Sequence, residues 1–401
     1  MTVRLRPLSV VPEGDDEVLV GDPATGTFVA IPAVGGVVIN ALQDGATVEE
    51  TARRAAEFAG EPVDVPAFVD ALRELGFVED PSDGTAQATA EATAPEPAGE
   101  RAPVATAPIQ GRRWLRGVRA DLARPLFGRI AWTVYALAAG FNVVALLFVP
   151  GLRPDPAHDV FFADVGLSTI LLYPMFLAVA ALHECWHWLA ARALGIPARF
   201  GVDRRMVFVV FETDLSQLWS VPRRRRYGPL LAGLAVDSLL LALSLALQWV
   251  TDLALLPALA YVLVFQIAWQ CMIFLRTDLY AVLVTWLRCK NLWRVQALLR
   301  RRAFGRLSAA EAEELAAADP HDLRVGRWFR WLWLAGVAVV VAWLGVFVLP
   351  VIVGLVQWAA TGLAAGPGAW AFWYALCCLA VVITPWVVAG WLAVRERARR
   401  P

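Results

Sequence analysis

Histidine, cysteine and lysine are scarce in this sequence. The 401 residues include four His and five Cys, and no two Cys are spaced as CxxC. We therefore expect the cysteines to be reduced residues in apolar surroundings, and we predict neither a disulfide framework nor a cysteine metal site. Lys290 is the single lysine among 36 basic residues. We attribute this bias toward arginine to a GC-rich genome more than to function.

Charged residues are also few, at 18%, whereas 58% of the residues are hydrophobic and the mean hydropathy is +0.55. This composition excludes an ordinary soluble protein and predicts membrane helices plus one small domain. Membrane topology and anionic lipid explain the basic cluster Arg223 to Arg226, so no nucleic-acid partner is expected. The stretch from Met1 to Gly21 is polar and mixed, so no N-terminal signal peptide is expected.

Six apolar runs have about the length of 20 residues that crosses a bilayer, or more. They are roughly Ile130–Val149, Ser168–Leu194, Leu230–Val250, Leu253–Leu275, Phe329–Trp358 and Ala369–Val394. Arginine gathers before run one, between runs two and three, between runs four and five, and after run six, while the other three loops hold only Arg153. The positive-inside rule then predicts a multi-pass protein of a bacterial cell membrane with both termini in the cytoplasm.

The second run contains the motif His183-Glu184-Cys185-Trp186-His187. Two His at positions i and i+4 lie on one helical face, where both can bind one zinc ion, and the adjacent glutamate can act as a general base on water. Ionisable side chains are costly inside a membrane, so such a cluster indicates a functional site. We predict His183 and His187 as Zn²⁺ ligands and Glu184 as the catalytic base.

A catalytic zinc ion needs a third protein ligand and one open position. Runs two and four both enter from outside, and Asp278 follows the cytoplasmic end of run four. Topology therefore places Asp278 at about the depth of the two His, and we predict it as the third ligand.

Three further residues are candidates near the site. Asp237 lies within run three, where it would either support the zinc site or substrate, or form a structural hydrogen bond between helices. The stretch Phe200–Phe211 is typical of two strands around a polar turn. Val207 and Val209 belong to this predicted hairpin, which would either hold an extended substrate beside the zinc or plug the helix bundle.

The first 80 residues have the pattern of a small soluble domain. Three short β-prone segments, Arg4–Val11, Glu17–Val20 and Thr27–Ile31, precede three segments with helical periodicity, Val34–Leu42, Val48–Phe58 and Val65–Leu75. This order suits a winged-helix-like domain or another α+β domain. Residues 81–111 are rich in Ala, Pro, Thr and Glu and are expected to be a disordered linker. Residues 112–401 form the transmembrane domain, in which Ser308 is expected to cap a short cytoplasmic helix.

The zinc motif and its flanks resemble the site-2 protease family of intramembrane zinc metalloproteases. Ala181–Ala190 resembles the family's zinc helix, and Thr277-Asp278-Leu279-Tyr280 resembles its third-ligand motif, with Leu279 where Gly is usual. Ala232-Gly233-Leu234 resembles the family's Gly-Pro segment, with Leu where Pro is common. The resemblance covers about residues 170–292 and implies a zinc endopeptidase. A glycine would adopt positive φ more freely than Leu279.

The N-terminal domain resembles the PqqD-like domains that recognise leader peptides of ribosomally made, modified peptides. The similarity lies in Gly26–Ile31, Val38–Gly45, Thr47–Glu50 and Phe68–Val78, over about 70 residues. It implies that the domain binds a peptide as an added strand. Together, the two resemblances suggest the peptide zinc metalloprotease variant that lacks a PDZ domain, and no PDZ-like stretch is visible here.

We therefore expect an α-helical polytopic membrane protein with about six transmembrane helices, a β-hairpin near the active site and an N-terminal winged-helix-like domain. The expected function is intramembrane hydrolysis of a leader-bearing or membrane-bound peptide. Two alternatives remain open at this point. One is a non-proteolytic peptide-binding, export or immunity protein that retains the zinc site, and the other is a signalling protease that cuts a single-span membrane protein.

Overall fold

The computed structural model describes residues 3–13, 16–23, 27–79, 112–115, 118–154, 164–205, 208–345 and 349–398. The chain divides into two compact units. The first comprises Met1–Gln110, Ile196–Ala198 and Asp214–Arg226, and the second comprises the remaining residues. The predicted linker at 81–111 lies outside the described residues.

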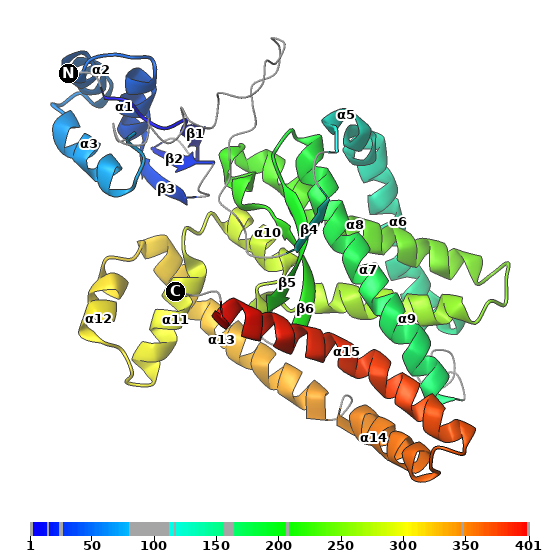
Figure 1. Ribbon diagram of the computed structural model, residues 1–401. Helices are drawn as coiled ribbons and strands as arrows, with labels where there is room; N and C mark the ends of the chain where they lie inside the picture. Colours follow the sequence, from blue (N-terminus) through cyan, green and yellow to red (C-terminus); the bar gives the residue numbers. More distant parts are fainter. Residues whose placement is uncertain are drawn as a thin grey trace, which may run out of the picture. The chain divides into compact units, whose positions relative to one another are not determined.

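The first unit contains a three-stranded antiparallel sheet followed by three helices, as the sequence predicts (Figure 1). These elements are β1 (Ser9–Pro12), β2 (Glu17–Asp22), β3 (Thr27–Pro32), α1 (Ala33–Gln43), α2 (Val48–Ala59) and α3 (Val65–Glu74), with strand order β1-β2-β3. The first strand is shorter than predicted, because Pro7 has no N–H to donate to a ladder. Leu5 instead forms an isolated bridge with Val78.

Local capping and apolar packing explain why these helices form. The Thr47 side chain accepts a hydrogen bond from the Glu50 N–H at the start of α2, and Asp64 does the same for the Ala67 N–H at the start of α3. The hydrophobic core of this unit includes the buried residues Val20, Ile39, Leu72 and Phe77.

Arg226 corrects one expectation about the basic cluster. We expected membrane topology and anionic lipid contact to explain the whole cluster at 223–226, but Arg226 is only 2% exposed. It forms an ion pair with Glu13, donates to the Trp219 carbonyl oxygen and lies over the Trp219 ring. A buried guanidinium needs such partners, so Arg226 is bound within the first unit, to which residues 214–226 belong.

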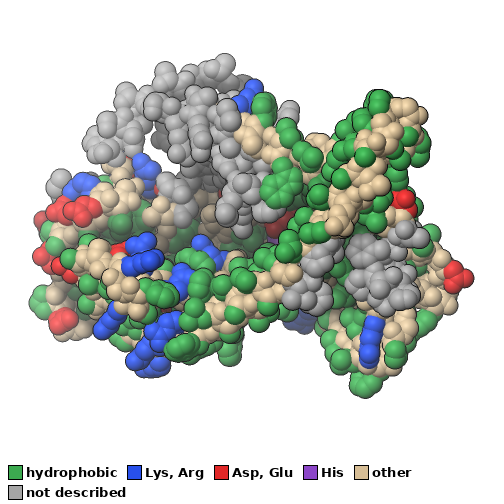
Figure 2. Space-filling model, turned by 90° about the horizontal axis from the view of Figure 1, so that it is seen from below, with side chains coloured by type: hydrophobic (Ala, Val, Ile, Leu, Met, Phe, Trp, Pro, Cys, Tyr) green, Lys and Arg blue, Asp and Glu red, His purple; other side chains and the backbone are tan. Residues whose placement is uncertain are grey.

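The second unit contains most of the long apolar helices. Five helical segments in the described part of the chain are long and apolar enough to cross a membrane: α6 (Arg129–Phe148), α7 (Val165–Ala193), α8 (Arg223–Leu247), α13 (Pro320–Trp343) and Trp370–Val388 of α15 (Trp370–Ala398). Large apolar side chains stand exposed on them, such as Ile130 at 83% and Trp370 at 79%. Hydrophobic side chains also spread over much of the face in Figure 2. Such surfaces are consistent with a helical membrane protein.

Two predicted runs differ from single spanning helices. Run four becomes α9 (Leu255–Gln270), whose 16 residues extend about 24 Å and so fall short of a hydrocarbon core of about 30 Å. Run five is described as α13 and α14 (Leu349–Ala364), and residues 346–348 between them lie outside the described residues. In Figure 1, α14 continues in the direction of α13, and α15 runs back beside α14.

The predicted hairpin is confirmed as two strands, β5 (Arg199–Arg205) and β6 (Phe208–Asp214). A third strand, β4 (Arg112–Leu115), pairs antiparallel with β5, giving the order β4-β5-β6. The arginine-rich β4 was not predicted, because its pattern shows no strand alternation. Val207 falls outside the described residues, while the backbone of Val209 lies within β6.

Short helices follow α9 in the second unit: η5 (Ile273–Leu275), α10 (Asp278–Leu287), α11 (Leu292–Ala303) and α12 (Ala309–Ala316). Ser308 is the N-cap of α12, as predicted, and forms a reciprocal capping box with Glu311. Asp322 accepts hydrogen bonds from the main-chain N–H groups of Lys290 and Asn291, which fixes the start of α11.

Candidate metal centre

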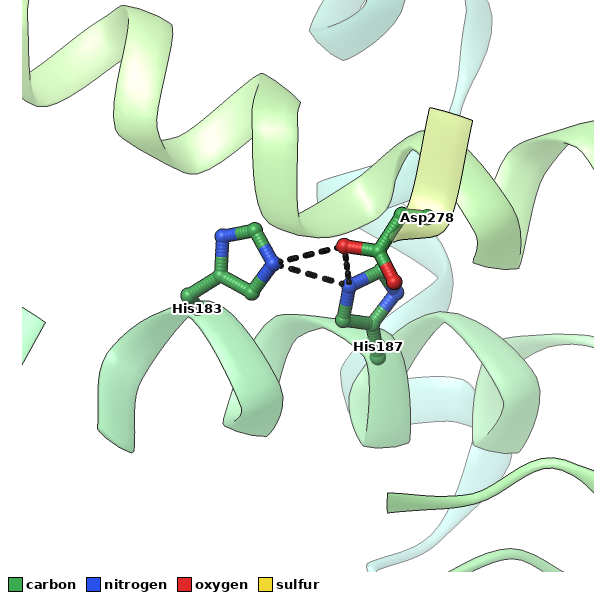
Figure 3. A group of neighbouring side chains, drawn as sticks. All are labelled: His183, His187 and Asp278. Carbon is green, nitrogen blue, oxygen red and sulfur yellow. Dashed lines mark hydrogen bonds and ion pairs between the residues drawn. The ribbon is translucent and has the colours of Figure 1, made fainter. Parts of the chain in front are cut away.

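His183 and His187 lie one turn apart on the same face of α7, as the motif predicts. Their side chains are buried, with residue exposures of 1% and 2%. Both rings point toward the Asp278 carboxylate (Figure 3). The Asp278 Oδ2 atom is 2.9 Å from His183 Nε2 and 3.1 Å from His187 Nε2, and the two Nε2 atoms are 3.1 Å apart. The structure therefore brings together the three predicted ligands, and their atoms could hold one metal ion.

Asp278 reaches this position because it is the first residue of α10. The turn before it is held by the Thr277 hydroxyl, which donates to the Gln270 carbonyl oxygen at 2.7 Å. Positive φ occurs at Arg276 (φ 60°), whereas Leu279 lies inside α10 without positive φ. The leucine at the family's usual glycine position is thus compatible with this backbone.

The outer nitrogen of each imidazole has its own partner. His183 Nδ1 lies 2.6 Å from Asp237 Oδ2, and His187 Nδ1 lies 2.6 Å from the Pro229 carbonyl oxygen. A carbonyl oxygen only accepts, so His187 Nδ1 must carry a proton, and an ionised Asp237 imposes the same tautomer on His183. In the neutral rings, both Nε2 atoms then present lone pairs toward Asp278.

The donor set matches the chemistry of zinc. Three acceptor atoms with no proton to share repel one another unless a cation lies between them. Two imidazole nitrogens and one carboxylate oxygen are ordinary zinc ligands, and tetrahedral ligands at about 2.0–2.1 Å from zinc are about 3.4 Å apart.

Gly233 on α8 allows the close approach of His183. A Cβ atom at this position would lie 2.3 Å from His183 Nε2 and 2.4 Å from its Cε1. Any side chain here would displace the ring, so the helix crossing at the site requires glycine.

Glu184 follows His183 on α7 and is held by β6. The Glu184 Oε2 atom accepts a hydrogen bond from the Thr213 main-chain N–H at 3.1 Å. The Thr213 hydroxyl donates to the Glu184 main-chain carbonyl oxygen at 2.6 Å. The β5–β6 hairpin therefore contacts α7 at Glu184, the predicted catalytic base.

Gln270 is a site residue that the sequence reasoning missed. Its Nε2 lies 3.1 Å from His183 Nε2, and its Oε1 accepts a hydrogen bond from the Asp278 N–H at 3.1 Å. The signal was present, since Gln270 is a polar amide near the end of the fourth apolar run, eight residues before the predicted ligand. Asp237, by contrast, was a candidate, and the structure places it against His183, with no side-chain exposure.

Comparisons with protein-family models, with curated proteins and with solved structures found no match for this chain. A functional assignment therefore depends on the residues and on the geometry of the site.

Proposed function

We propose that this protein is an intramembrane zinc metalloendopeptidase whose N-terminal domain recruits a leader-bearing or membrane-bound peptide. The observation that carries the proposal is the convergence of His183 Nε2, His187 Nε2 and Asp278 Oδ2 within 3.1 Å of one another. The Nδ1 atoms of His183 and His187 are hydrogen-bonded to Asp237 and to the Pro229 carbonyl oxygen, which leaves both Nε2 atoms for a metal ion. Such a site is arranged to bind a cation, and Glu184 beside it supplies the base.

His183, His187 and Asp278 would hold the zinc ion, which when bound would act as a Lewis acid toward a peptide carbonyl and would acidify water. The remaining chemistry belongs to the chain. The Glu184 carboxylate would accept a proton from the attacking water and pass it to the leaving amine nitrogen. The Gln270 amide N–H would donate to the substrate carbonyl oxygen as negative charge develops there.

The first unit has a suitable edge for a peptide. Strand β3 is at one end of the β1-β2-β3 order, with no further strand beside it among the described residues. A peptide added along β3 would gain main-chain hydrogen bonds. We further propose a bacterial cell membrane location with cytoplasmic termini, since arginine gathers in the loops assigned to that side. This topology requires α9 to cross as a short sixth span in addition to the five longer helices.

The test compares the wild-type protein, purified in detergent, with Glu184→Gln and with Glu313→Gln, a matched change of an exposed glutamate on α12. The probe is a defined mixture of synthetic peptides, with cleavage sites read by mass spectrometry and zinc measured by elemental analysis. We expect one zinc per chain in all three proteins. Cleavage should fall by about 10²–10⁴-fold only in Glu184→Gln.

Two results would contradict the proposal. Glu184→Gln could cleave at the wild-type rate while retaining zinc, which would remove the base assignment. Alternatively, the wild-type protein could carry full zinc and cut no peptide, which would favour a non-proteolytic binding protein. A gene for a short precursor peptide next to this gene would favour peptide maturation over signalling proteolysis.

A further inference from the structure

The strand β6 ends at the predicted catalytic base. Thr213, the residue before the last of β6, contacts Glu184 at two points, through its main-chain N–H and through its hydroxyl. The two residues are 29 positions apart in sequence, so this contact depends on the tertiary fold. It fixes both the carboxylate and the backbone of the same residue.

Among the residues that the structure describes, Thr213 provides the one hydrogen bond to the Glu184 carboxylate. A glutamate side chain has several rotatable bonds, and fixing them costs conformational entropy. A base left free would therefore spend much of its time out of reach of the attacking water. The Thr213 N–H belongs to β6, whose position is set by its pairing within the sheet. A donor fixed in this way keeps the Glu184 carboxylate in its working position for more of the time.

The hydroxyl contact adds a second constraint. The Glu184 carbonyl oxygen belongs to α7, and the Thr213 hydroxyl donates to it at 2.6 Å. A helix carbonyl can accept this bond in addition to its bond within the helix, because it has two lone pairs. The hydroxyl thus keeps β6 against α7 at the level of the base, and so keeps the N–H in line with the carboxylate.

From these contacts we propose that Thr213 is the positioning residue of Glu184: it holds the base in its working orientation without touching the substrate itself. The inference rests on the proposed function for its catalytic part. Its structural part, the contact between Thr213 and Glu184, holds independently of turnover.

The activity test uses Thr213→Val, which keeps the shape and the main-chain N–H but removes the hydroxyl, and Thr213→Ser, which restores the hydroxyl. The probe is whichever peptide the wild-type protein cleaves in the mixture described above. We expect Thr213→Val to lower kcat by about tenfold, with KM within twofold and zinc content unchanged, and Thr213→Ser to stay within about threefold of wild type. An unchanged kcat in Thr213→Val would overturn the proposal. So would a serine variant as slow as the valine variant.

The second measurement needs no activity. Amide hydrogen exchange at Thr213 is compared between wild type and Glu184→Ala, both stripped of zinc, with Glu313→Ala as the matched control. Loss of the carboxylate acceptor should speed exchange of the Thr213 amide by about tenfold, and the control should not change it. Equal exchange in all three proteins would show that the contact is absent. If the wild-type protein cleaves nothing but exchange responds as expected, the proposed function fails while the contact stands.

Discussion

Replacing Gly233 with alanine should remove zinc from the site without unfolding the protein. The added Cβ would lie 2.3 Å from His183 Nε2, whereas ordinary contact begins at 3.4 Å, so the ring would have to retreat by about 1.1 Å. His183 has little freedom to do so, because it is buried and its Nδ1 is held at 2.6 Å by Asp237. Zinc ligands tolerate displacements of only about 0.2 Å.

The expected size of this effect follows from the shift. Removing a residue that only hydrogen-bonds to a metal ligand lowers metal affinity by about 10–100-fold. In Gly233→Ala, the ligand atom His183 Nε2 itself moves. We therefore expect zinc affinity to fall by at least about 100-fold, or about 2.7 kcal/mol. Alanine favours the helix over glycine by about 1 kcal/mol. A loss of zinc affinity in Gly233→Ala therefore cannot come from a weaker helix propensity of α8.

The assay is competition for zinc against a chromophoric chelator, in detergent, with circular dichroism as the measure of folding. Gly140→Ala is the matched control, since Gly140 also lies in a long apolar helix, α6, and a Cβ there meets nothing within 4 Å. Gly140→Ala should bind zinc as wild type does. Wild-type zinc affinity in Gly233→Ala would refute the geometry proposed for His183.

Three other predictions follow. Two concern side chains at the site, and the third concerns α12, a helix that lies outside the site. Asp237→Asn removes the charged partner of His183 Nδ1, so it should lower zinc affinity by about 10–100-fold in the same competition assay. The thermal unfolding temperature should change little. An equal loss of thermal stability would favour a structural hydrogen bond between helices. Gln270→Leu should lower kcat by about 10²-fold and leave zinc bound; elemental analysis with kinetics checks both, and an unchanged kcat would exclude the donor role. Ser308→Ala should destabilise α12 by about 1 kcal/mol, read by local hydrogen exchange, without altering zinc content; a loss of zinc there would contradict the separation of α12 from the site.

The candidate ligand set could be predicted from the sequence because each of its residues has a local or topological signal. The spacing of His183 and His187 fixes one helical face, and the predicted direction of runs two and four led to Asp278. Asp237 could be named as a candidate because a buried charge in a membrane helix needs a partner. Its contact with His183, however, depends on how α7 and α8 cross, and sequence spacing carries no such information.

The remaining features depend on packing or on backbone detail. Gln270 and Thr213 reach the site only through tertiary contacts, and neither belongs to a motif with a local pattern. Strand β4 was missed because strand pairing, rather than alternation of its own side chains, makes it a strand.

The measurement closest to the central claim is zinc X-ray absorption spectroscopy on the purified wild-type protein. The account predicts a first shell of nitrogen and oxygen atoms at about 2.0–2.1 Å, with the outer-shell scattering of two imidazole rings. His187→Ala should lose one of these rings or the metal. A sulfur ligand at about 2.3 Å, or a protein that binds no zinc at all, would contradict the three-ligand site formed by His183, His187 and Asp278.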